Sequence, residues 1–354
     1  MKIVFDNIIF SLQKTGGISV YWDELLKHIR NDDNFQTQMI GNINNNIFGK
    51  QYNTLLQKES IIPISILRYL SFRKEIKQKT IFHSSYYRTS NSKKAINVTT
   101  IHDFTYEYFV RGLPKKIHCW QKYQAIQKSD AIICISENTK KDLLKFIPSA
   151  KEKIIRVIPN GVSDKYYIDN QKNIKDIIPF EKENYILFIG SRAEYKNFSL
   201  AANTIAKSKY NFVIIGTPLS QKEKIELDNI FEKNRYCILS NISNETLNIL
   251  YNNAFCLLYP SAYEGFGIPI LEAQRAGCPV IAYKASSVPE IIGNTPLLLQ
   301  KLNIEDVLEK FYELESSILR QKIIKEGIEN SKNYSWNNTY KKTIELYQEL
   351  WESI

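Results

Sequence analysis

The sequence of 354 residues lacks any run of about 18 consecutive apolar residues, the length that a membrane-spanning helix needs. Residues 1–6 form an apolar run that ends at a carboxylate, and no small-residue cleavage site follows it. This run is too short for a signal peptide. We therefore expect a cytoplasmic protein that does not cross the membrane.

Metal-binding patterns are absent as well. The five cysteines are odd in number and contain no C-x-x-C pair, so we expect reduced thiols rather than disulfides or a zinc site. The four histidines form no H-E-x-x-H pair, and no two aspartates stand two positions apart to hold a metal–nucleotide complex. The sequence predicts a metal-independent protein without a cofactor.

Short β-branched runs alternate with helical patterns along the whole sequence. The near-continuous apolar character of these runs is typical of strands that are covered on both faces. Alternation of this kind predicts an α/β fold with parallel sheets. The expected strands are 2–6, 80–84, 98–102, 131–136, 154–159, 185–190, 212–216, 236–239, 254–260 and 279–283, and the expected helices include 18–30, 113–128, 200–207, 222–233 and 304–315.

At about 150 residues per domain, the length favours two domains. The polar stretch 164–184 is the predicted boundary, so we place the first domain at residues 1–175 and the second at 176–334. Residues 335–354 carry apolar side chains at helical spacing, and we expect this helix to cross back to the first domain. Two such sheets would then face a central cleft that is lined by the carboxyl ends of their strands.

Positive charge is concentrated in the first half. Residues 1–180 contain 28 Lys and Arg against 16 Asp and Glu, whereas residues 181–354 contain 19 against 21. Residues 61–94 alone hold eight basic residues and one acid. Two interpretations stay open, a cationic amphipathic helix on an anionic membrane surface or an ordinary helix with a solvated basic face. We expect no nucleic acid as a partner, because no nucleic-acid-binding motif is present.

The strongest functional signal is the segment 259–273, Y-P-S-A-Y-E-G-F-G-I-P-I-L-E-A. An apolar strand leads into a loop with two glycines, and Pro269 stands where the first turn of a helix would begin. Amides at a helix N-terminus attract anions, and glycines let the backbone approach a ligand. Glu264 and Glu272 flank this loop, and each can accept hydrogen bonds from sugar or ribose hydroxyls.

This segment closely resembles the signature of the family 4 retaining glycosyltransferases, in which two glutamates are separated by seven residues. The resemblance implies a GT-B fold whose second domain holds most of a nucleotide-diphosphate sugar, the donor. It also implies that Glu264 contacts the donor sugar and Glu272 the ribose. The residues whose backbone would then bind the sugar or the diphosphate are Gly265, Phe266, Gly267 and Ile268.

A second segment, residues 188–197, resembles the G-x-R-x-x-x-K-N turn of the same family. Gly190 begins this turn after an apolar strand. Arg192 and Lys196 are predicted to neutralise the departing diphosphate, which would stabilise charge that develops in the transition state.

Two features of the first half also resemble the family. Gly16 and Gly17 match the glycine loop that approaches the donor phosphate, although a glycine pair is by itself an ordinary turn. His102 ends an apolar strand and matches a histidine that contacts the donor sugar, although a lone histidine there is often structural. One departure is Ser286-Ser287, where many members have a glycine pair, and we expect it to affect donor preference.

These residues together predict a retaining hexosyltransferase that resembles the mannosyltransferase-like members of surface-polysaccharide and lipopolysaccharide synthesis. The expected donor is a nucleotide-diphosphate hexose such as mannose, and the expected acceptor is a glycan or a lipid-linked oligosaccharide at the inner face of the membrane. The alternatives are a GT-B-like sugar-nucleotide epimerase or phosphorylase, and a catalytically silent nucleotide-sugar-binding protein. The predicted catalytic residues are His102, Arg192, Lys196 and Glu264.

Overall fold

The computed structural model describes residues 1–169 and 174–354. The described chain divides into two compact units: the first contains Met1–Gly161 and Trp336–Ile354, and the second contains Val162–Ser335. The predicted boundary after residue 175 falls within the second unit. Within the predicted boundary stretch 164–184, residues 170–173 lie outside the described residues.

The first unit is built on a parallel sheet of six strands in the order β2–β1–β3–β4–β5–β6. Its strands are β1 (Lys2–Asp6), β2 (Gln36–Ile40), β3 (Thr80–Ser84), β4 (Ala95–Ile101), β5 (Ala131–Cys134) and β6 (Ile154–Val157). β2 was not among the predicted strands, because the sequence Q-T-Q-M-I is polar and its first residues are exposed at the sheet edge.

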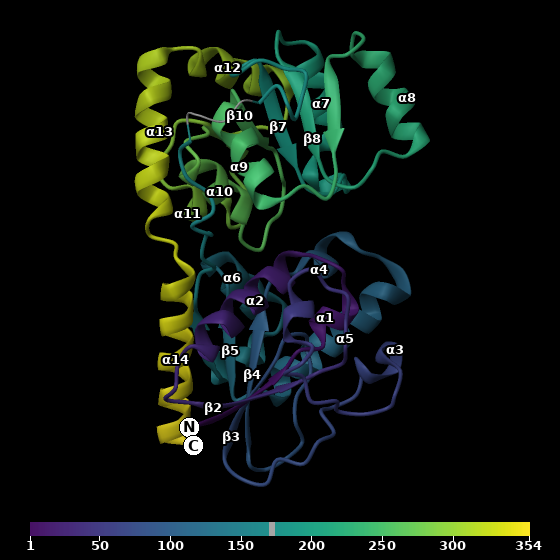
Figure 1. Ribbon diagram of the computed structural model, residues 1–354, viewed down its shortest axis with the longest axis vertical. Coiled ribbons are helices and arrows are strands. Elements are labelled where there is room, and N and C mark those ends of the chain that lie inside the picture. Colours follow the sequence, from purple (N-terminus) through teal and green to yellow (C-terminus); the bar gives the residue numbers. More distant parts are fainter. Residues whose placement is uncertain (170–173) are drawn as a thin grey trace. The chain divides into compact units, whose positions relative to one another are not determined.

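The helices of the first unit are α1 (Ile9–Leu12), α2 (Gly17–Arg30), α3 (Ile64–Leu67), α4 (Thr105–Phe109), α5 (Gly112–Lys128), α6 (Glu137–Phe146) and α14 (Trp336–Ser353). The last of these returns to the first unit and contacts α2, as predicted (Figure 1). Tyr347 of α14 bonds to Nδ1 of the buried His83 at 2.6 Å, and Thr100 bonds to Nε2. Burial lowers the pKa of His83 to about 3, so its ring stays neutral in this structural role.

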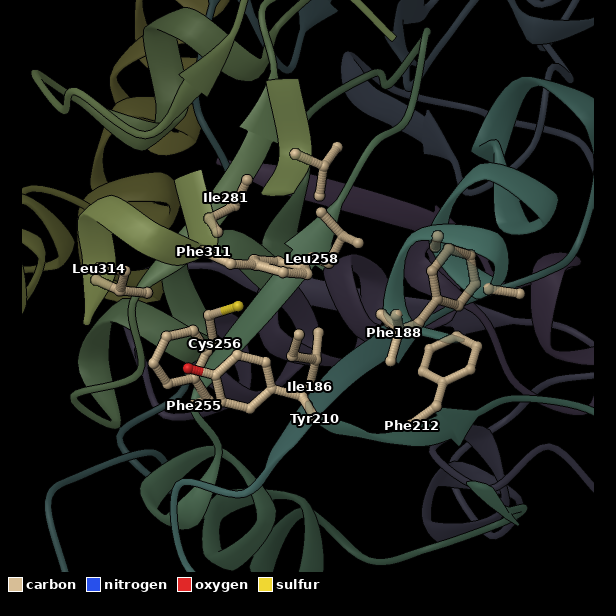
Figure 2. Packing of buried hydrophobic residues seen from close by; sticks show 14 of the residues in the cluster. Ile186, Phe188, Tyr210, Phe212, Phe255, Cys256, Leu258, Ile281, Phe311 and Leu314 are labelled. Atoms are coloured by element: carbon tan, nitrogen blue, oxygen red, sulfur yellow. The ribbon is translucent and has the colours of Figure 1, made fainter. Parts of the chain in front are cut away.

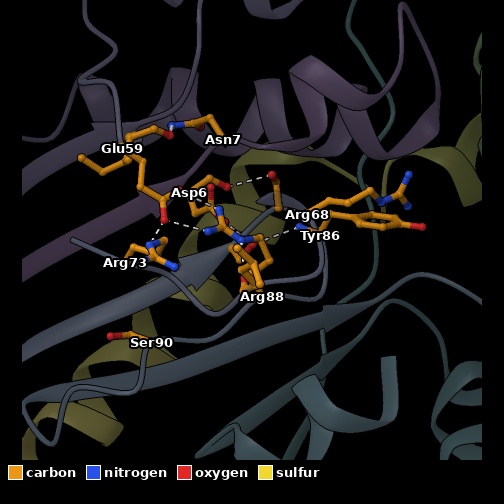
Figure 3. Close-up of polar contacts among 12 residues, drawn as sticks. Asp6, Asn7, Glu59, Arg68, Arg73, Tyr86, Arg88 and Ser90 are labelled. Carbon is orange, nitrogen blue, oxygen red and sulfur yellow. Dashed lines mark hydrogen bonds and ion pairs between the residues drawn. The ribbon is translucent and has the colours of Figure 1, made fainter. Parts of the chain in front are cut away.

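A buried cluster of charges fixes a loop of the first unit to β1 (Figure 3). Arg88 donates to Asp6 Oδ2 at 3.0 Å and to both carboxylate oxygens of Glu59 at 2.9 and 2.7 Å. All three side chains are almost completely buried. Buried charges are tolerated only when they are closely paired. The cluster therefore fixes the loop that carries Arg88 to β1.

The basic segment 61–94 does not form the predicted amphipathic helix. Only α3, four residues long, is helical between residues 61 and 79. Phe72 instead extends beside residues 89 and 90, where its amide bonds to the Thr89 carbonyl at 2.9 Å. Its ring packs against Phe82 of the sheet, with centroids 4.6 Å apart. This tertiary pairing overrides the local helical pattern, and both interpretations that assumed a helix here were wrong in that respect.

The second unit contains another parallel sheet of six strands, in the order β12–β11–β10–β7–β8–β9. Its strands are β7 (Tyr185–Ile189), β8 (Asn211–Ile215), β9 (Tyr236–Leu239), β10 (Cys256–Tyr259), β11 (Val280–Tyr283) and β12 (Leu298–Leu299). Its helices are α7 (Phe198–Ala206), α8 (Gln221–Ile230), α9 (Asn244–Asn253), α10 (Ile268–Arg275), α11 (Val288–Ile292), α12 (Ile304–Leu314) and α13 (Ser317–Ser331). The predicted α/β class with parallel sheets is confirmed.

The core of the second unit is rich in aromatic rings (Figure 2). Tyr210 stacks on Phe255 with centroids 4.1 Å apart, and Phe311 from α12 meets Tyr210 edge-on. Phe188 of β7 packs against Phe212 of β8 in the same core. Large buried aromatic groups contribute strongly to stability, so this core supplies a firm base for the loops at the carboxyl ends of β7 and β10.

Candidate active site

The loop that follows β10 forms the centre of the candidate site. It leads into α10, and Gly267 is the residue that precedes this helix. Gly267 has a φ of 101°, and a Cβ there would lie 3.2 Å from the Ile270 side chain, so any other residue would be strained at this position. Pro269 lies in the first turn, as the sequence predicted. The N-terminus of α10 therefore begins directly at the predicted anion-binding loop, which contains Gly265 and Phe266.

Glu264 of this loop pairs with Lys196 from the turn after β7. The Lys196 Nζ lies 2.5 Å from Glu264 Oε1, and both side chains are mostly buried. The ammonium group also lies 5.6 Å from the ring centre of Tyr259 and 5.5 Å from that of Tyr195. The structure thus brings together one charged residue from each of the two predicted motifs. A cation and a carboxylate therefore share one location.

Tyr259 adds a further contact to Glu264. Burial, followed by the charge of Glu264 and a hydrogen bond to it, raises the pKa of Tyr259 well above its ordinary value, so the phenol stays protonated and donates. The backbone is joined as well: the Ala262 amide bonds to the Tyr195 carbonyl at 2.7 Å, and Asn197 bonds to the Pro260 carbonyl at 2.8 Å. The two loops therefore form one connected structure.

Ser286 and Ser287 support the Glu264 loop from the segment before α11. The amide of Glu264 donates to Ser286 Oγ at 2.8 Å. The Ser287 hydroxyl contacts the carbonyls of Glu264 and Phe266, at 2.9 and 3.0 Å. Ser286 has a φ of 48°, a conformation that glycine adopts readily, which explains physically why a glycine can stand there. The serines keep that backbone shape and add hydrogen bonds to the loop.

Arg192 has a different partner from the one that the diphosphate prediction assumed. Its Nε lies 2.5 Å from Glu223 Oε1, and its guanidinium also donates to the Thr217 and Pro218 carbonyls. Hydrogen bonds from Arg192 and Ser220 lower the pKa of Glu223 to about 2. Gly190 lies at the end of β7 with a φ of 128°, which favours glycine. The structure therefore pairs Arg192 and Lys196 with separate carboxylates.

Glu272 lies in α10 beside two tyrosines. The Tyr251 hydroxyl donates to Glu272 Oε2 at 3.1 Å, and Tyr166 also donates to this carboxyl group. Burial raises the pKa of Glu272 to about 7, against the lowering effect of the two hydrogen bonds. Near neutral pH the carboxyl group is thus divided between its two protonation states. As a carboxylate it accepts hydrogen bonds, and when protonated it can also donate one.

The remaining predicted residues belong to the first unit. Gly16 is the residue before α2, and Gly17 is the first residue of that helix. His102 follows β4 and is buried, with its ring edge-on to Tyr21 at a centroid distance of 5.1 Å. Burial lowers the pKa of His102 to about 4, opposed by Asp103, so the imidazole is neutral at physiological pH. A neutral imidazole can donate one hydrogen bond and accept another.

Several contact residues of the site were absent from the sequence predictions. Tyr259, Tyr166 and Tyr251 contact the two motif glutamates, and Glu223 holds Arg192. Tyr259 belongs to the motif but has no predicted role, and the other three carry no local signal, because they come from distant elements. Among the described residues, no three His, Cys, Asp or Glu side chains form a group that could hold a metal ion. No described helix is long and apolar enough to cross a membrane.

Both halves of the chain match models of known protein families. Residues 15–166 match the model of Glycosyltransferase Family 4, and residues 169–330 match that of Glycosyl transferases group 1. The chain belongs to the family 4 glycosyltransferases, and it is a glycosyltransferase with a GT-B fold.

Two curated relatives are bacterial. The chain is 26% identical over 278 residues to O-antigen chain mannosyltransferase B of Escherichia coli. This match covers 72% of this chain and 70% of the relative. It is 27% identical over 203 residues to O-antigen chain mannosyltransferase RfbU of Salmonella typhimurium, which covers 56% of this chain and 55% of the relative. The match thus spans about half the length of the second relative.

Solved structures agree on the fold. Sucrose-phosphate synthase from Thermosynechococcus elongatus superposes with a TM-score of 0.76 at 16% identity, over 100% of both chains. HepE of Anabaena, solved with UDP and glucose, gives a TM-score of 0.73 at 14% identity, over 99% of this chain and 100% of that one. At these identities the likeness concerns the fold alone.

Proposed function

We propose that this chain is a retaining hexosyltransferase that moves a hexose, with mannose as the first candidate, from a nucleotide-diphosphate donor to a glycan or lipid-linked oligosaccharide. The observation that carries the proposal is the Lys196–Glu264 pair beside the amides that open α10. Two relatives named as O-antigen mannosyltransferases support the choice of mannose and of surface-polysaccharide synthesis. A fold neighbour solved with UDP-glucose supports the class of donor.

In this proposal the loop binds the donor through backbone and side-chain groups together. The amides around Gly267 and Ile268, with Lys196, bind the diphosphate, because a helix N-terminus and a cation both favour negative charge. Glu264 accepts hydrogen bonds from sugar hydroxyls. Glu272, shared with Tyr251 and Tyr166, binds the ribose diol.

The reaction breaks the bond between the anomeric carbon and the diphosphate oxygen, and the bonding electrons pass to the leaving phosphate. The acceptor hydroxyl attacks on the face from which the diphosphate departs, so the anomeric configuration is retained. Its proton passes to a leaving phosphate oxygen. Lys196 stabilises the charge that accumulates there, and Arg192 joins it when the diphosphate competes with Glu223.

The roles of His102, Gly16, Gly17 and Gly190 in donor binding remain proposals that rest on the family resemblance. The same holds for a cytoplasmic location and for attachment to an anionic membrane through the exposed basic residues of 61–94, which are Arg73, Lys77, Lys93 and Lys94. A lipid-linked acceptor lies at a membrane surface, so attachment to an anionic membrane would bring the enzyme to its acceptor.

A donor panel tests the proposal. Purified protein is incubated with GDP-mannose, UDP-glucose and UDP-galactose, with and without methyl mannosides as acceptors, and the products are followed by proton NMR. We expect one donor to be consumed and a glycoside to form with the donor's anomeric configuration. A converted sugar that stays on its nucleotide would instead identify an epimerase. A glycoside of inverted anomeric configuration would contradict a retaining mechanism, and consumption of no donor would contradict the proposed transferase activity.

A further inference from the structure

Two ion pairs connect the turn after β7 to the segments on either side of it. In the second sheet, β7 lies between β10 and β8. Lys196 pairs with Glu264 from the loop after β10, whereas Arg192 pairs with Glu223 from α8, which follows β8. The two cations that the proposed mechanism assigns to the diphosphate are therefore held by carboxylates from opposite neighbours of the turn.

The guanidinium of Arg192 is closely engaged by oxygen atoms of the protein. Its Nε lies 2.5 Å from Glu223 Oε1 and its Nη2 lies 3.3 Å from Glu223 Oε2, so both carboxylate oxygens take part. Nη1 donates to the Thr217 carbonyl and Nη2 to the Pro218 carbonyl, each at 2.9 Å. The Arg192 side chain is only 8% exposed. A diphosphate oxygen therefore gains this cation only by displacing some of these partners, because the N–H groups of an arginine are limited in number.

Glu223 keeps partners of its own when Arg192 leaves it. Its Oε2 accepts a hydrogen bond from the Ser220 amide at 2.7 Å and another from the Ser220 hydroxyl at 2.6 Å, as part of the capping box of α8. The Glu223 side chain is 27% exposed, so water can solvate Oε1. Exchange of Arg192 between this carboxylate and a diphosphate thus avoids the cost of an unpaired buried charge.

The charge of the diphosphate changes during the proposed reaction. When the bond from the anomeric carbon breaks, the leaving nucleoside diphosphate gains an ionisable oxygen and becomes more negative than the donor. Cations that stabilise this charge also hold the product more tightly, and product release limits the turnover of many enzymes. A carboxylate that recaptures one of these cations shortens the lifetime of the product complex.

We propose that Glu223 is a positioning residue that competes with the diphosphate for Arg192 and thereby promotes release of the nucleoside diphosphate product. The inference rests on the proposed transferase function and adds a control of diphosphate affinity at the same site. Charge distinguishes this role from a purely structural one. The capping box needs only a hydrogen-bonding side chain, whereas competition for Arg192 needs a negative charge.

Calorimetric binding of GDP, UDP and ADP to the full chain tests the competition. Glu223→Gln keeps a side chain that can complete the α8 cap, and it removes the charge that holds Arg192. We expect its Kd for the bound nucleoside diphosphate to be about five- to tenfold lower than that of the wild type. Asp228→Asn is the matched control, because Asp228 lies in the same helix and contacts Lys224 and Tyr236, and it should leave the Kd unchanged.

The same substitution in an Arg192→Gln background shows whether Glu223 acts through Arg192. We expect Glu223→Gln to have no effect on the Kd there. Equal tightening with and without Arg192 would overturn the inference, because Glu223 would then repel the diphosphate directly. An unchanged or higher Kd for Glu223→Gln alone would overturn it as well, because Glu223 would then serve only to hold the segment before α8.

Turnover separates this inference from the proposed function. If the wild type consumes a nucleotide sugar and Glu223→Gln binds the diphosphate no more tightly, the inference is wrong and the function stands. If Glu223→Gln binds more tightly and no donor is consumed, the competition for Arg192 stands and the transferase is rejected.

A measurement on the wild type decides if Glu223→Gln fails to fold. The NMR signal of the Arg192 Nε–H group is assigned by its loss in Arg192→Gln, and GDP, UDP and ADP are then added to the wild type. We expect the signal to move when a diphosphate binds, because Nε exchanges its Glu223 partner for the ligand. A signal that stays in place while the diphosphate binds would overturn the inference.

Discussion

Lys196 Nζ lies 2.5 Å from Glu264 Oε1, so the cation of one sequence motif pairs with the carboxylate of the other. The two residues are 68 positions apart and come from the loops that follow β7 and β10, which are neighbouring parallel strands. Parallel strands present their carboxyl ends at one edge of a sheet, where ligands commonly bind. A ligand that carries both an anion and hydroxyl groups would meet both residues there.

Replacement of Lys196 by alanine should lower kcat by about 100- to 1,000-fold, because it removes a charge that stabilises the leaving diphosphate. Lys209→Ala is the matched control, since Lys209 also pairs with a glutamate of the second unit but is exposed. The measurement is the steady-state rate of donor consumption by both variants. A kcat for Lys196→Ala close to that of the control would remove Lys196 from the mechanism.

Replacement of Ser287 by alanine should affect both stability and donor use. Ser287 is completely buried and its hydroxyl contacts the carbonyls of Glu264 and Phe266. Loss of the hydroxyl leaves two buried acceptors with fewer partners, so the free energy of unfolding should fall by about 1–3 kcal/mol. We expect kcat/KM for the donor to fall as well, by about tenfold, because the loop is no longer held in place.

The control for this experiment is Ser208→Ala, which removes a hydroxyl bonded to the Ile205 carbonyl in the same unit. It should cost stability, measured by urea denaturation, without a change in kcat/KM. If Ser287→Ala and Ser208→Ala leave kcat/KM equally unchanged, the serine contacts support the fold and do not position the donor loop.

Glu272 should make stability depend on pH. Its pKa is raised to about 7 in the folded chain, mainly by burial, above the ordinary value of 4.5. The folded state therefore binds more protons than the unfolded state between these two values, and the free energy of unfolding should fall as pH rises from about 4.5 to 7. Glu272→Gln removes this titration.

The test compares urea denaturation of the wild type and Glu272→Gln at pH 5 and pH 8. Relative to the variant, the wild type should be less stable at pH 8 than at pH 5. A difference between the two proteins that stays constant over this range would show that Glu272 titrates normally. Tyr251→Phe, which removes one stabilising hydrogen bond to the carboxylate, should shift the transition to higher pH.

Arg88→Met should destabilise the first unit strongly. The change leaves the buried carboxylates of Asp6 and Glu59 without their cation, and removal of one partner from a buried charge cluster costs about 3–5 kcal/mol. The measurement is the thermal unfolding midpoint, with Lys77→Met as a control because Lys77 pairs with Glu75 at the exposed surface. Equal midpoints for the two variants would contradict a structural role for the Arg88 cluster.

Much of the fold could be predicted from sequence because buried parallel strands are nearly continuous apolar runs. All ten predicted strands exist, with ends shifted by a few residues at most. The two that were missed, β2 and β12, are edge strands, one polar and one only two residues long. The helix predicted within 61–94 failed because the Phe72 backbone pairs with residues 89 and 90, a long-range contact that local periodicity does not contain.

The candidate site was predictable where a motif is local and not where partners are distant. Glu264, Gly267 and the start of α10 follow from one continuous segment. The Arg192–Glu223 pair and the tyrosines around Glu272 come from separate elements, so no spacing in the sequence indicates them. In the sequence Ser286 is only a departure from the family pattern. Its φ of 48° and its hydrogen bond from the Glu264 amide explain that departure physically.

The most direct test of the central claim is calorimetric binding of GDP, UDP and ADP to the wild-type chain and to Gly267→Ala. Alanine is strained at a φ of 101° and would displace the amides that open α10. The account predicts that one nucleoside diphosphate binds the wild type and that Gly267→Ala weakens this Kd at least tenfold while the protein remains folded. Binding of no nucleoside diphosphate by the wild type, or equal binding by both proteins, would contradict the claim that this loop holds the donor.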